Sequence, residues 1–535
     1  MTLYYLKSNT IAEPLIHRWY AWPMLISPAT LALITLKSHM SMLRSYIQMP
    51  KMHENAVRDP NMRGGPFMDF NGQNRVPEVK AYLESMQDSE LLELANGLIQ
   101  LNQLLQQANG HSLLSYYPEI PEILKGYVEL VYDLNNHPNF RIIEGLLYRS
   151  PFYNEQAQSI LLSTLTSDQR SFVLSTPRLS FDQELVWNIP FKSKELDLLF
   201  SSREQGMTQE QLLSFFVRHF ADTPANKELF LSFFTDKKNP VNEEYKRYTG
   251  DEVRIRYFGH ACVLIESKNT TILVDPMISY GYKTDTERFT YDDLPEHIDY
   301  IILTHAHQDH VMLEHLLQIR YKTGTIIVPK NASGTLQDPS LKLMLKQVGF
   351  QHIIELDEME NVPLPDGEIL GIPFFGEHGD LYIQSKMAYV LRLQGKSILL
   401  AADSDNIEPK LYEHLQREIP NLDVIFLGME CSGAPVSWLY GSLFPSTLTR
   451  SMDQSRRLNG SNYERAMEII RCFDCSQIYV YAMGQEPWLG YITSIEYTDE
   501  SYPIIESNQL IAQCQKEGRK AERLFLQKEI ILSNE

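Results

Sequence analysis

Residues 299–310 read DYIILTHAHQDH, an apolar, β-branched run followed at once by four side chains that commonly bind metal. A strand through the apolar run places His305 and His307 on one side of the following loop, because alternate residues of an extended chain share a face. Asp309 and His310 come next, at the start of an expected helix, and can turn toward a second ion. The stretch therefore predicts a site for two metal ions directly after a buried strand.

The sequence around this stretch predicts a catalytic domain over residues 246–535. Apolar runs typical of strands come first without helices between them, and later ones alternate with helical segments. This order predicts two sheets covered by helices, an αβ/βα sandwich in the α/β class. Residues 253–257 alternate as a half-buried strand, and residues 504–528 predict an amphipathic helix on the outside.

Residues 1–245 predict a separate, mixed α/β domain. Residues 77–107 carry apolar side chains at helical spacing, Thr208 to Gln211 has the pattern of a helix-capping box, and residues 185–190 are typical of a strand. The polar stretch 236–251 is the expected linker. Six His residues of this part are scattered singly, and we expect each to lie at the surface or in the core rather than to bind metal: His17, His39, His53, His111, His137 and His219.

Composition restricts the class of partner and the compartment. The net charge of −20 argues against nucleic acid, whose phosphates normally demand a basic face. Five Cys residues without the spacing of secreted domains predict reduced thiols and a cytoplasmic protein. The pair Cys472 and Cys475 alone cannot close a tetrahedral zinc site. The apolar residues 19–36 are interrupted by Pro23 and Pro28, so we expect neither a membrane span nor a signal peptide.

The HxHxDH pattern of residues 305–310 is the signature of the metallo-β-lactamase fold, and other landmarks of that fold follow in order. Asp275 ends an early strand, and in such proteins this acid usually supports the ligand loop. Glu377 and His378 stand where the third loop ligand is expected. Asp403 ends a later strand, where the family places the carboxylate that bridges both ions. The resemblance thus extends over most of the C-terminal half.

Two departures from the hydrolases of this fold concern the ligands. Those enzymes complete the second site with a final His, but this chain has no His after His414, which lies in an expected surface helix. Neighbouring side chains of an extended segment point apart, so we expect one of Glu377 and His378 to reach the metals. Asp405 is expected to support the site without binding metal. If Glu377 is the ligand, the set has three imidazoles and three carboxylates, which suits iron better than closed tetrahedral zinc. That set is His305, His307, Asp309, His310, Glu377 and Asp403.

This altered pattern, in a chain with a large N-terminal domain, resembles the diiron β-hydroxylases of the chloramphenicol-biosynthesis type. The resemblance implies a cluster of two Fe ions with Glu377 as a ligand. It implies that His305, His307 and Glu377 bind one iron, that Asp309 and His310 bind the other, and that Asp403 bridges them. It also implies that the N-terminal domain dimerises the protein or forms the substrate channel, so a homodimer is expected.

Members of that family hydroxylate the β-carbon of an amino acid tethered as a thioester to the carrier domain of a nonribosomal peptide synthetase. The resemblance therefore implies an O2-dependent monooxygenase. It also implies an electron-transfer partner as an external electron donor, because no flavin or nicotinamide motif is visible in the chain. The candidate residues for binding the carrier domain through positive charge are Arg450, Arg456 and Arg457. The alternative is that they form a solvated basic turn without a partner.

The main alternative is a zinc-dependent hydrolase of the same fold, which cleaves a phosphodiester, lactone or thioester with a metal-bound hydroxide. His378 would then be the ligand, and Gln485 or Glu486 would replace the missing His. A non-catalytic scaffold with a degenerate site is a third possibility. Metal content distinguishes the three, because iron supports the oxygenase, zinc the hydrolase and a metal-free protein the scaffold.

Overall fold

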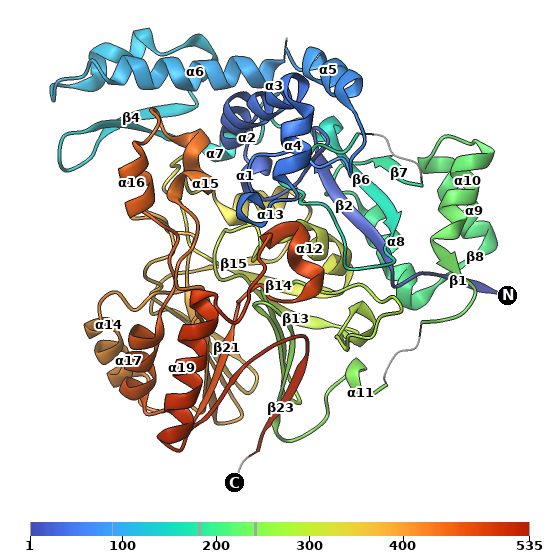
Figure 1. Cartoon of the computed structure of the whole chain (residues 1–535), viewed down its shortest axis with the longest axis vertical. Coiled ribbons are helices and arrows are strands. Elements are labelled where there is room, and N and C mark those ends of the chain that lie inside the picture. Colours follow the sequence, from blue (N-terminus) through green and yellow to red (C-terminus); the bar gives the residue numbers. More distant parts are fainter. Residues whose placement is uncertain (1, 88, 180–182, 240–242, 534–535) are drawn as a thin grey trace.

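Two seven-stranded sheets packed face to face form the centre of the C-terminal part in the computed structural model, which describes residues 2–87, 89–179, 183–239 and 243–533 (Figure 1). Buried side chains such as Val263, Leu391 and Phe426 fill the space between the sheets. Helices cover the outer faces, so the predicted αβ/βα sandwich is confirmed. Part of the predicted linker, residues 240–242, lies outside the described residues.

The first sheet has the order β15-β14-β13-β12-β11-β10-β23. β10, β11 and β12 are antiparallel neighbours, and β12 to β15 are parallel. Strands buried on both faces explain the nearly continuous apolar runs of the sequence. These strands are β10 (Val253–Gly259), β11 (Cys262–Glu266), β12 (Thr271–Val274), β13 (Ile298–Ile302), β14 (Thr323–Pro329) and β15 (Ile353–Leu356).

The second sheet has the order β16-β17-β18-β19-β20-β21-β22 and the same change from antiparallel to parallel pairing. The sequence did not predict β16 and β17, which contain Asn361, Pro363 and Gly367 in place of a continuous apolar run. These strands are β16 (Asn361–Leu364), β17 (Gly367–Ile372), β18 (Ala388–Leu393), β19 (Lys396–Leu400), β20 (Val424–Gly428) and β21 (Gln477–Tyr481).

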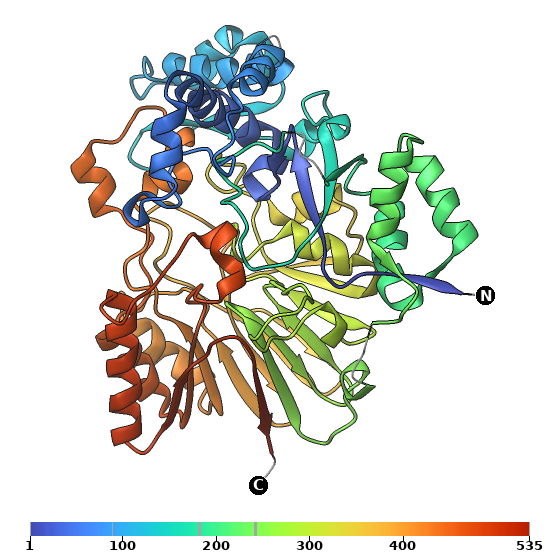
Figure 2. The ribbon, with the colours of Figure 1, turned by 45° about the vertical axis from the view of Figure 1, so that its right-hand side comes forward.

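The C-terminal segment completes both sheets, and the helix predicted over residues 504–528 is wrong beyond residue 516. α19 spans Tyr502–Lys516, and Gly518 follows with a φ of 78°, outside the right-handed helical region. β22 (Lys520–Arg523) then pairs parallel with β21, and β23 (Lys528–Leu532) pairs antiparallel with β10. The last residues therefore tie the edges of the two sheets together (Figure 2).

Helices pack on each outer face of the sandwich. α14, α17 and α19 share a buried core with the second sheet, and α12 and α13 share one with the first sheet and the N-terminal part. His414 lies on α14 and is exposed, as expected. The further helices of this half are α12 (Leu313–Ile319), α13 (Leu341–Gln347), α14 (Lys410–Glu418), α15 (Val436–Tyr440), α16 (Arg450–Ser455), α17 (Tyr463–Phe473) and α18 (Gly490–Thr493).

The N-terminal part is mixed α/β, as predicted. The region 77–107 forms two helices, α5 and α6, and Ser89 caps the second through a bond from Leu92 N. The capping box at Thr208 begins α9. The helices are α1 (Pro23–Ile26), α2 (Pro28–Ile34), α3 (Met40–Gln48), α4 (Pro50–Ala56), α5 (Val76–Ser85), α6 (Glu90–Leu105), α7 (Glu144–Leu147), α8 (Lys194–Gln205), α9 (Gln209–His219), α10 (Pro224–Ser232) and α11 (Glu243–Lys246).

Three small sheets complete this part, with the orders β3-β2-β6-β7, β8-β1-β9 and β4-β5. The strand predicted at residue 185 is β7. In the part of the chain that the structure describes, no helix has the length and apolarity to cross a membrane. The strands are β1 (Leu3–Leu6), β2 (Thr10–Ile16), β3 (Trp19–Tyr20), β4 (Val128–Tyr132), β5 (Pro138–Ile142), β6 (Gln158–Thr164), β7 (Leu185–Asn188), β8 (Met207–Thr208) and β9 (Phe234–Thr235).

Buried polar contacts join the N-terminal part to the sandwich. Glu314 on α12 is fully buried, accepts hydrogen bonds from the Tyr20 and Tyr280 hydroxyls at 2.9 and 2.7 Å, and pairs with Arg170 at 2.9 Å. Glu13 on β2 pairs with the same guanidinium group at 2.8 Å. Because these charges are paired and hydrogen-bonded, they can lie between the two parts without an unpaired buried charge.

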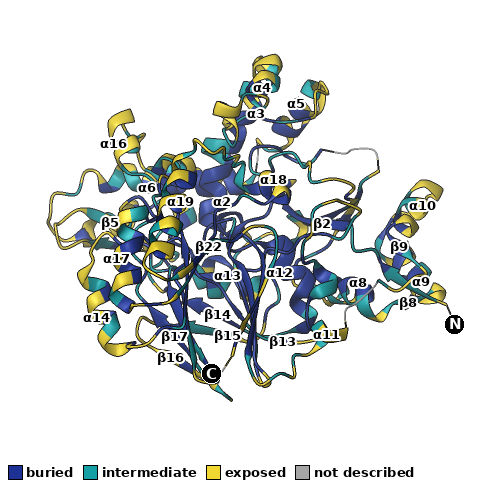
Figure 3. Cartoon of the chain, turned by 60° about the horizontal axis from the view of Figure 1, so that its bottom comes forward, coloured by how far each residue is buried: buried dark blue, intermediate teal, exposed yellow. Residues whose placement is uncertain are grey.

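The strand predicted as half-buried at residues 253–257 is buried on both faces, which corrects the expectation. Arg254 and Arg256 are 1% and 0% exposed, and both guanidinium groups donate hydrogen bonds to Glu266. Tyr245 on α11 lies over Arg256, 4.2 Å from ring centre to guanidinium carbon. The alternation arises because the outer face holds a covered ionic cluster rather than solvated charges. Figure 3 shows that the strands of the sandwich are largely buried.

Candidate metal centre

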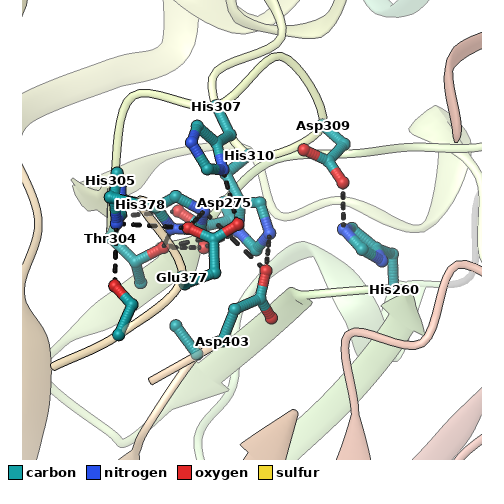
Figure 4. A network of polar contacts seen from close by, with 12 residues as sticks. His260, Asp275, Thr304, His305, His307, Asp309, His310, Glu377, His378 and Asp403 are labelled. Carbon is teal, nitrogen blue, oxygen red and sulfur yellow. Dashed lines mark hydrogen bonds and ion pairs between the residues drawn. The ribbon is translucent and has the colours of Figure 1, made fainter. Parts of the chain in front are cut away.

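The predicted ligand loop connects β13 to α12, and its side chains converge on a buried site (Figure 4). His305 and His310 are fully buried, His307 is 5% exposed, and Asp309 is partly exposed. Asp309 and His310 lie before α12, which begins only at Leu313, so the expectation that they open the helix is corrected. A turn rather than a helix therefore sets the directions of all four side chains.

A first group of possible ligands consists of His305, His307 and Glu377, whose donor atoms lie within 4.8 Å of one another. Glu377 Oε1 is 2.8 Å from His307 Nδ1, and its Oε2 is 3.6 Å from His305 Nε2. Glu377 has a φ of 64°, a left-handed conformation that non-glycine residues rarely adopt and that often marks a functional site. Two nitrogens and a carboxylate thus face one common point.

A second group consists of His260, Asp309 and His310, and the sequence analysis missed His260. His260 Nε2 lies 3.4 Å from Asp309 Oδ2, and its ring centre is 4.9 Å from that of His310. The residue sits between β10 and β11 with a φ of 50°, and its carbonyl accepts a 2.9 Å bond from Ala482 N after β21. His260 thereby adds an imidazole to the group of possible ligands that lacks the usual last His of the fold.

Asp403 connects the two groups. Its Oδ2 lies 3.0 Å from His310 Nε2 and 3.8 Å from His305 Nε2. One carboxylate therefore faces both groups, which is the position required of a bridging ligand. The described residues place it after β19, as the sequence analysis expected.

Several buried polar atoms of these residues have no hydrogen-bond partner, although such atoms are normally paired. A ligand set of imidazoles and carboxylates with unpaired lone pairs fits two divalent metal ions, and its oxygen content suits iron. The unpaired atoms are His260 Nδ1 and Nε2, His305 Nε2, Glu377 Oε2 and Asp403 Oδ1.

Hydrogen bonds behind the ligands fix the orientation of the imidazole rings. Asp275 Oδ2 lies 2.8 Å from His310 Nδ1, and its Oδ1 accepts a 2.8 Å bond from Thr304 N. The Tyr440 hydroxyl lies 3.2 Å from His307 Nε2. These contacts leave His310 Nε2 and His307 Nδ1 facing the site, and they show Asp275 in the supporting position expected of it.

Glu377 and His378 are both buried, and Glu377 Oε2 lies 3.3 Å from His378 Nδ1, but their other contacts differ. His378 Nδ1 donates a 3.1 Å hydrogen bond to the Gly376 carbonyl, and its ring centre is 4.6 Å from that of His307. Among the described residues His378 belongs to none of the ligand groups, whereas Glu377 does. The geometry therefore favours Glu377 as the metal ligand of this loop.

Two further carboxylate candidates, Asp405 and Glu486, lie outside the ligand groups of the described residues. Asp405 pairs with Arg465, and its backbone N donates a 2.7 Å bond to the Phe375 carbonyl, so it supports the loop that carries Glu377. Glu486 accepts a hydrogen bond from Tyr257. Gln485 precedes it in the chain, and its buried Oε1 has no hydrogen-bond partner. The single His residues of the N-terminal part also lie outside the ligand groups.

Burial and charge interactions separate the pKa values of the groups in this site. Burial, followed by the neighbouring imidazoles, lowers the pKa of His305 well below its usual value. Burial alone would lower the pKa of His310, but the Asp403 and Asp275 carboxylates raise it well above the usual value. Burial raises the pKa of Glu377 to about 7, against the opposing effect of His307.

Glu430 is a second residue that the sequence analysis missed. It follows β20 and is partly exposed. Burial raises the pKa of its carboxyl group well above the usual value, and the Asp403, Glu377 and Asp309 carboxylates raise it further. Because three carboxylates of the site affect its pKa, Glu430 belongs to the surroundings of the ligand groups.

These features define a metalloenzyme of the metallo-β-lactamase superfamily with an oxygen-rich site for two ions. A β-lactamase superfamily domain matches residues 254–419, and the N-terminal domain of diiron non-haem β-hydroxylases matches residues 5–238. The chain belongs to the family of diiron non-haem β-hydroxylases, and it is an enzyme whose ligand groups fit the pair of irons of that family.

The similarity to characterised relatives extends over the full chain. The chain is 38% identical over 535 residues to the 3-hydroxylase of 4-amino-L-phenylalanyl-CmlP-peptidyl-carrier-protein from Streptomyces venezuelae, covering 99% of this chain and 100% of that one. The crystal structure of CmlA, a diiron β-hydroxylase from the same organism, matches with a TM-score of 0.92 at 36% identity, covering 99% and 100% of the two chains. A metal-dependent hydrolase of Anoxybacillus flavithermus is 41% identical over 181 residues, which cover 33% of this chain and 72% of that one. The full-length match favours the hydroxylase over the hydrolase.

Proposed function

We propose that the protein hydroxylates the β-carbon of an amino acid tethered to the carrier domain of a nonribosomal peptide synthetase, with O2 as co-substrate. The observation that carries this proposal is the ligand set with Glu377 and bridging Asp403, in a chain that matches a carrier-protein-dependent 3-hydroxylase from end to end. When bound and reduced, the two irons supply the activation of O2. Two electrons per turnover come from a separate electron-transfer partner.

The proposal assigns one iron to His305, His307 and Glu377, and the other to Asp309 and His310, with Asp403 as the bridge. We add His260 as a ligand of the second iron, because its unpaired nitrogens face Asp309 and His310. Tyr440 and Asp275 orient two of the imidazoles through the ring nitrogens that point away from the irons.

A cavity of about 610 Å³ between the two parts of the chain is the proposed route of the substrate. Arg63, Phe67 and Phe172 line it from the N-terminal part, and Glu486 and Tyr497 line it from the C-terminal part. Burial raises the pKa of Tyr497, and the Glu430 carboxyl raises it further. We therefore propose that residues 1–245 and 246–535 act as two domains that form the substrate channel together.

The proposal includes a homodimer, a carrier bound at the channel mouth and a cytoplasmic location. Arg450 is exposed at the start of α16, whereas Arg456 donates a 2.9 Å bond to the Gly379 carbonyl and Arg457 donates a 2.8 Å bond to Gln454. Of the three arginine side chains, that of Arg450 is thus the most available to bind the carrier domain. The free thiols of all five Cys residues support a reducing compartment.

The direct test is intact-protein mass spectrometry of a carrier domain loaded with 4-amino-L-phenylalanine, after incubation with iron-loaded protein, O2 and a reductant. We expect a gain of one oxygen on the loaded carrier and little turnover of the free amino acid, because a tethered substrate is positioned by its carrier. Two zinc ions per chain from iron-rich cells, with hydrolysis of a phosphodiester or thioester, would instead support the hydrolase.

A further inference from the structure

Glu486 is a buried carboxylate without a cationic partner among the described residues. Its side chain is 3% exposed; one oxygen accepts a hydrogen bond from the Tyr257 hydroxyl, and Oε2 has no partner. A buried carboxylate that is neither paired with a cation nor fully hydrogen-bonded is unfavourable, so proteins keep such groups where a ligand completes them.

Two other charged residues that line the cavity, Arg170 and Asp168, are already paired. Arg170 pairs with Glu314 at 2.9 Å, and Asp168 pairs with Arg288 at 2.6 Å. Glu486 lines the same cavity and keeps its free oxygen. Glu486 is therefore a residue of the cavity lining whose buried carboxyl oxygen has no hydrogen-bond partner.

The free oxygen belongs to a side chain that packs next to the second ligand group. A Cβ on Gly259 would lie 3.2 Å from Glu486 Cγ and 2.9 Å from Trp488, so both side chains pack closely against this glycine. The next residue, His260, reaches Asp309 (Figure 4). The backbone N–H of Ala482, in the loop that leads to Glu486, also bonds to the His260 carbonyl at 2.9 Å.

We propose that Glu486 binds the α-ammonium group of the carrier-bound aminoacyl thioester and thereby positions its β-carbon for hydroxylation. This inference rests on the proposed function, because it requires an aminoacyl substrate in the cavity. Every amino acid on a carrier has this nitrogen, whatever its side chain, and a carboxylate is its natural charge-assisted partner.

The covalent structure of the substrate explains why binding its α-nitrogen at Glu486 would position the β-carbon. The α-nitrogen and the β-carbon are both bonded to Cα, so they are about 2.5 Å apart. Fixing the nitrogen next to the ligand groups therefore confines the β-carbon to the same small region, while the thioester leads back along the cavity. Tyr257 contributes by holding the other carboxylate oxygen, because burial and then Glu486 raise the pKa of its hydroxyl and keep it a donor.

The experiment compares two probes that differ only in the α-amino group. A carrier domain is loaded through phosphopantetheine with 4-amino-L-phenylalanine or with 3-(4-aminophenyl)propanoate. The dissociation constant of each loaded carrier from the iron-loaded protein is then measured without O2. The variants are Glu486→Gln, Glu486→Asp and the control Glu496→Gln. Glu496 lines the same cavity, but its side chain is 64% exposed and pairs with Arg63. Iron content is measured for every variant.

We expect the wild-type protein to bind the aminoacyl carrier at least roughly tenfold more tightly than the desamino carrier. A charge-assisted hydrogen bond at a buried site contributes about this much to the binding affinity. Glu486→Gln should reduce this preference to less than about threefold with both irons retained. Glu486→Asp should keep part of the preference, and Glu496→Gln all of it.

Three results would overturn the inference: a wild-type protein with no preference, a Glu486→Gln variant that keeps the full preference, or loss of iron from that variant, which would make Glu486 part of the metal site. The failure of the proposed function looks different. In that case the wild-type protein would bind neither loaded carrier and add no oxygen to the aminoacyl carrier.

Discussion

The adjacent residues Glu377 and His378 give the sharpest test of the metal centre. In the variant Glu377→Ala, the first iron loses one of the three donors that converge within 4.8 Å, and only His305, His307 and the bridge remain. Changes to residues that merely orient a ligand weaken metal binding by about 10–100-fold. Loss of the ligand itself should exceed this range, which corresponds to more than about 2.8 kcal/mol at about 1.4 kcal/mol per tenfold change.

His378→Gln is the matched variant, because the neighbouring side chain is equally buried and an amide can still donate to the Gly376 carbonyl. We expect it to keep two irons per chain, while Glu377→Ala keeps about one or none. Elemental analysis together with circular dichroism separates iron loss from unfolding. Retention of both irons by Glu377→Ala, with loss from His378→Gln, would refute the ligand assignment and favour a hydrolase-like site.

Three further predictions concern the metal site and the buried ionic cluster on the first sheet. Iron affinity should fall as the pH is lowered through about 7. Burial raises the pKa of the Glu377 carboxyl to about 7 before metal binds, and this group must lose its proton to bind metal. Metal titrations from pH 8 to pH 6 measure this change. Tyr440→Phe should weaken iron binding by about 10–100-fold without unfolding, because His307 loses the contact that orients its ring, as competition with a chelator would show. Glu266→Ala should lower the free energy of unfolding by about 3–5 kcal/mol in urea titrations, because it leaves two buried guanidinium groups unpaired.

The sandwich was predictable because its central strands are buried on both faces and so appear as apolar runs. Two kinds of element escaped prediction for opposite reasons. β16 and β17 have too few consecutive apolar residues, because β16 lies at the sheet edge and tolerates polar side chains. The final helix was predicted too long, because an amphipathic pattern does not show that Gly518 ends it or that the following residues pair with β21 and β10.

The site was predictable to the extent that its residues are close in the sequence or follow strands at the positions the fold uses. His260 and Glu430 had neither signal. His260 lies in a turn between two strands, 49 positions before Asp309, and only the antiparallel start of the first sheet and a left-handed backbone bring the two together. Glu430 follows β20 as a single acidic residue, and its closeness to three carboxylates depends on the neighbouring parallel strand β19.

The loop after β21 accounts both for the missing His and for the position of Glu486, the residue proposed to bind the substrate nitrogen. Hydrolases of this fold use the loop after the equivalent of β21 for their last imidazole, but here that loop carries Glu486, which turns toward Tyr257 and the cavity. His260 approaches the second ligand group from the opposite strand pair, and Ala482 N–H holds it there through its carbonyl. Because the nitrogen donor comes from another part of the fold, the loop is free to face the substrate. A site built for hydrolysis at a metal-bound water can in this way accommodate a tethered aminoacyl group beside its metals.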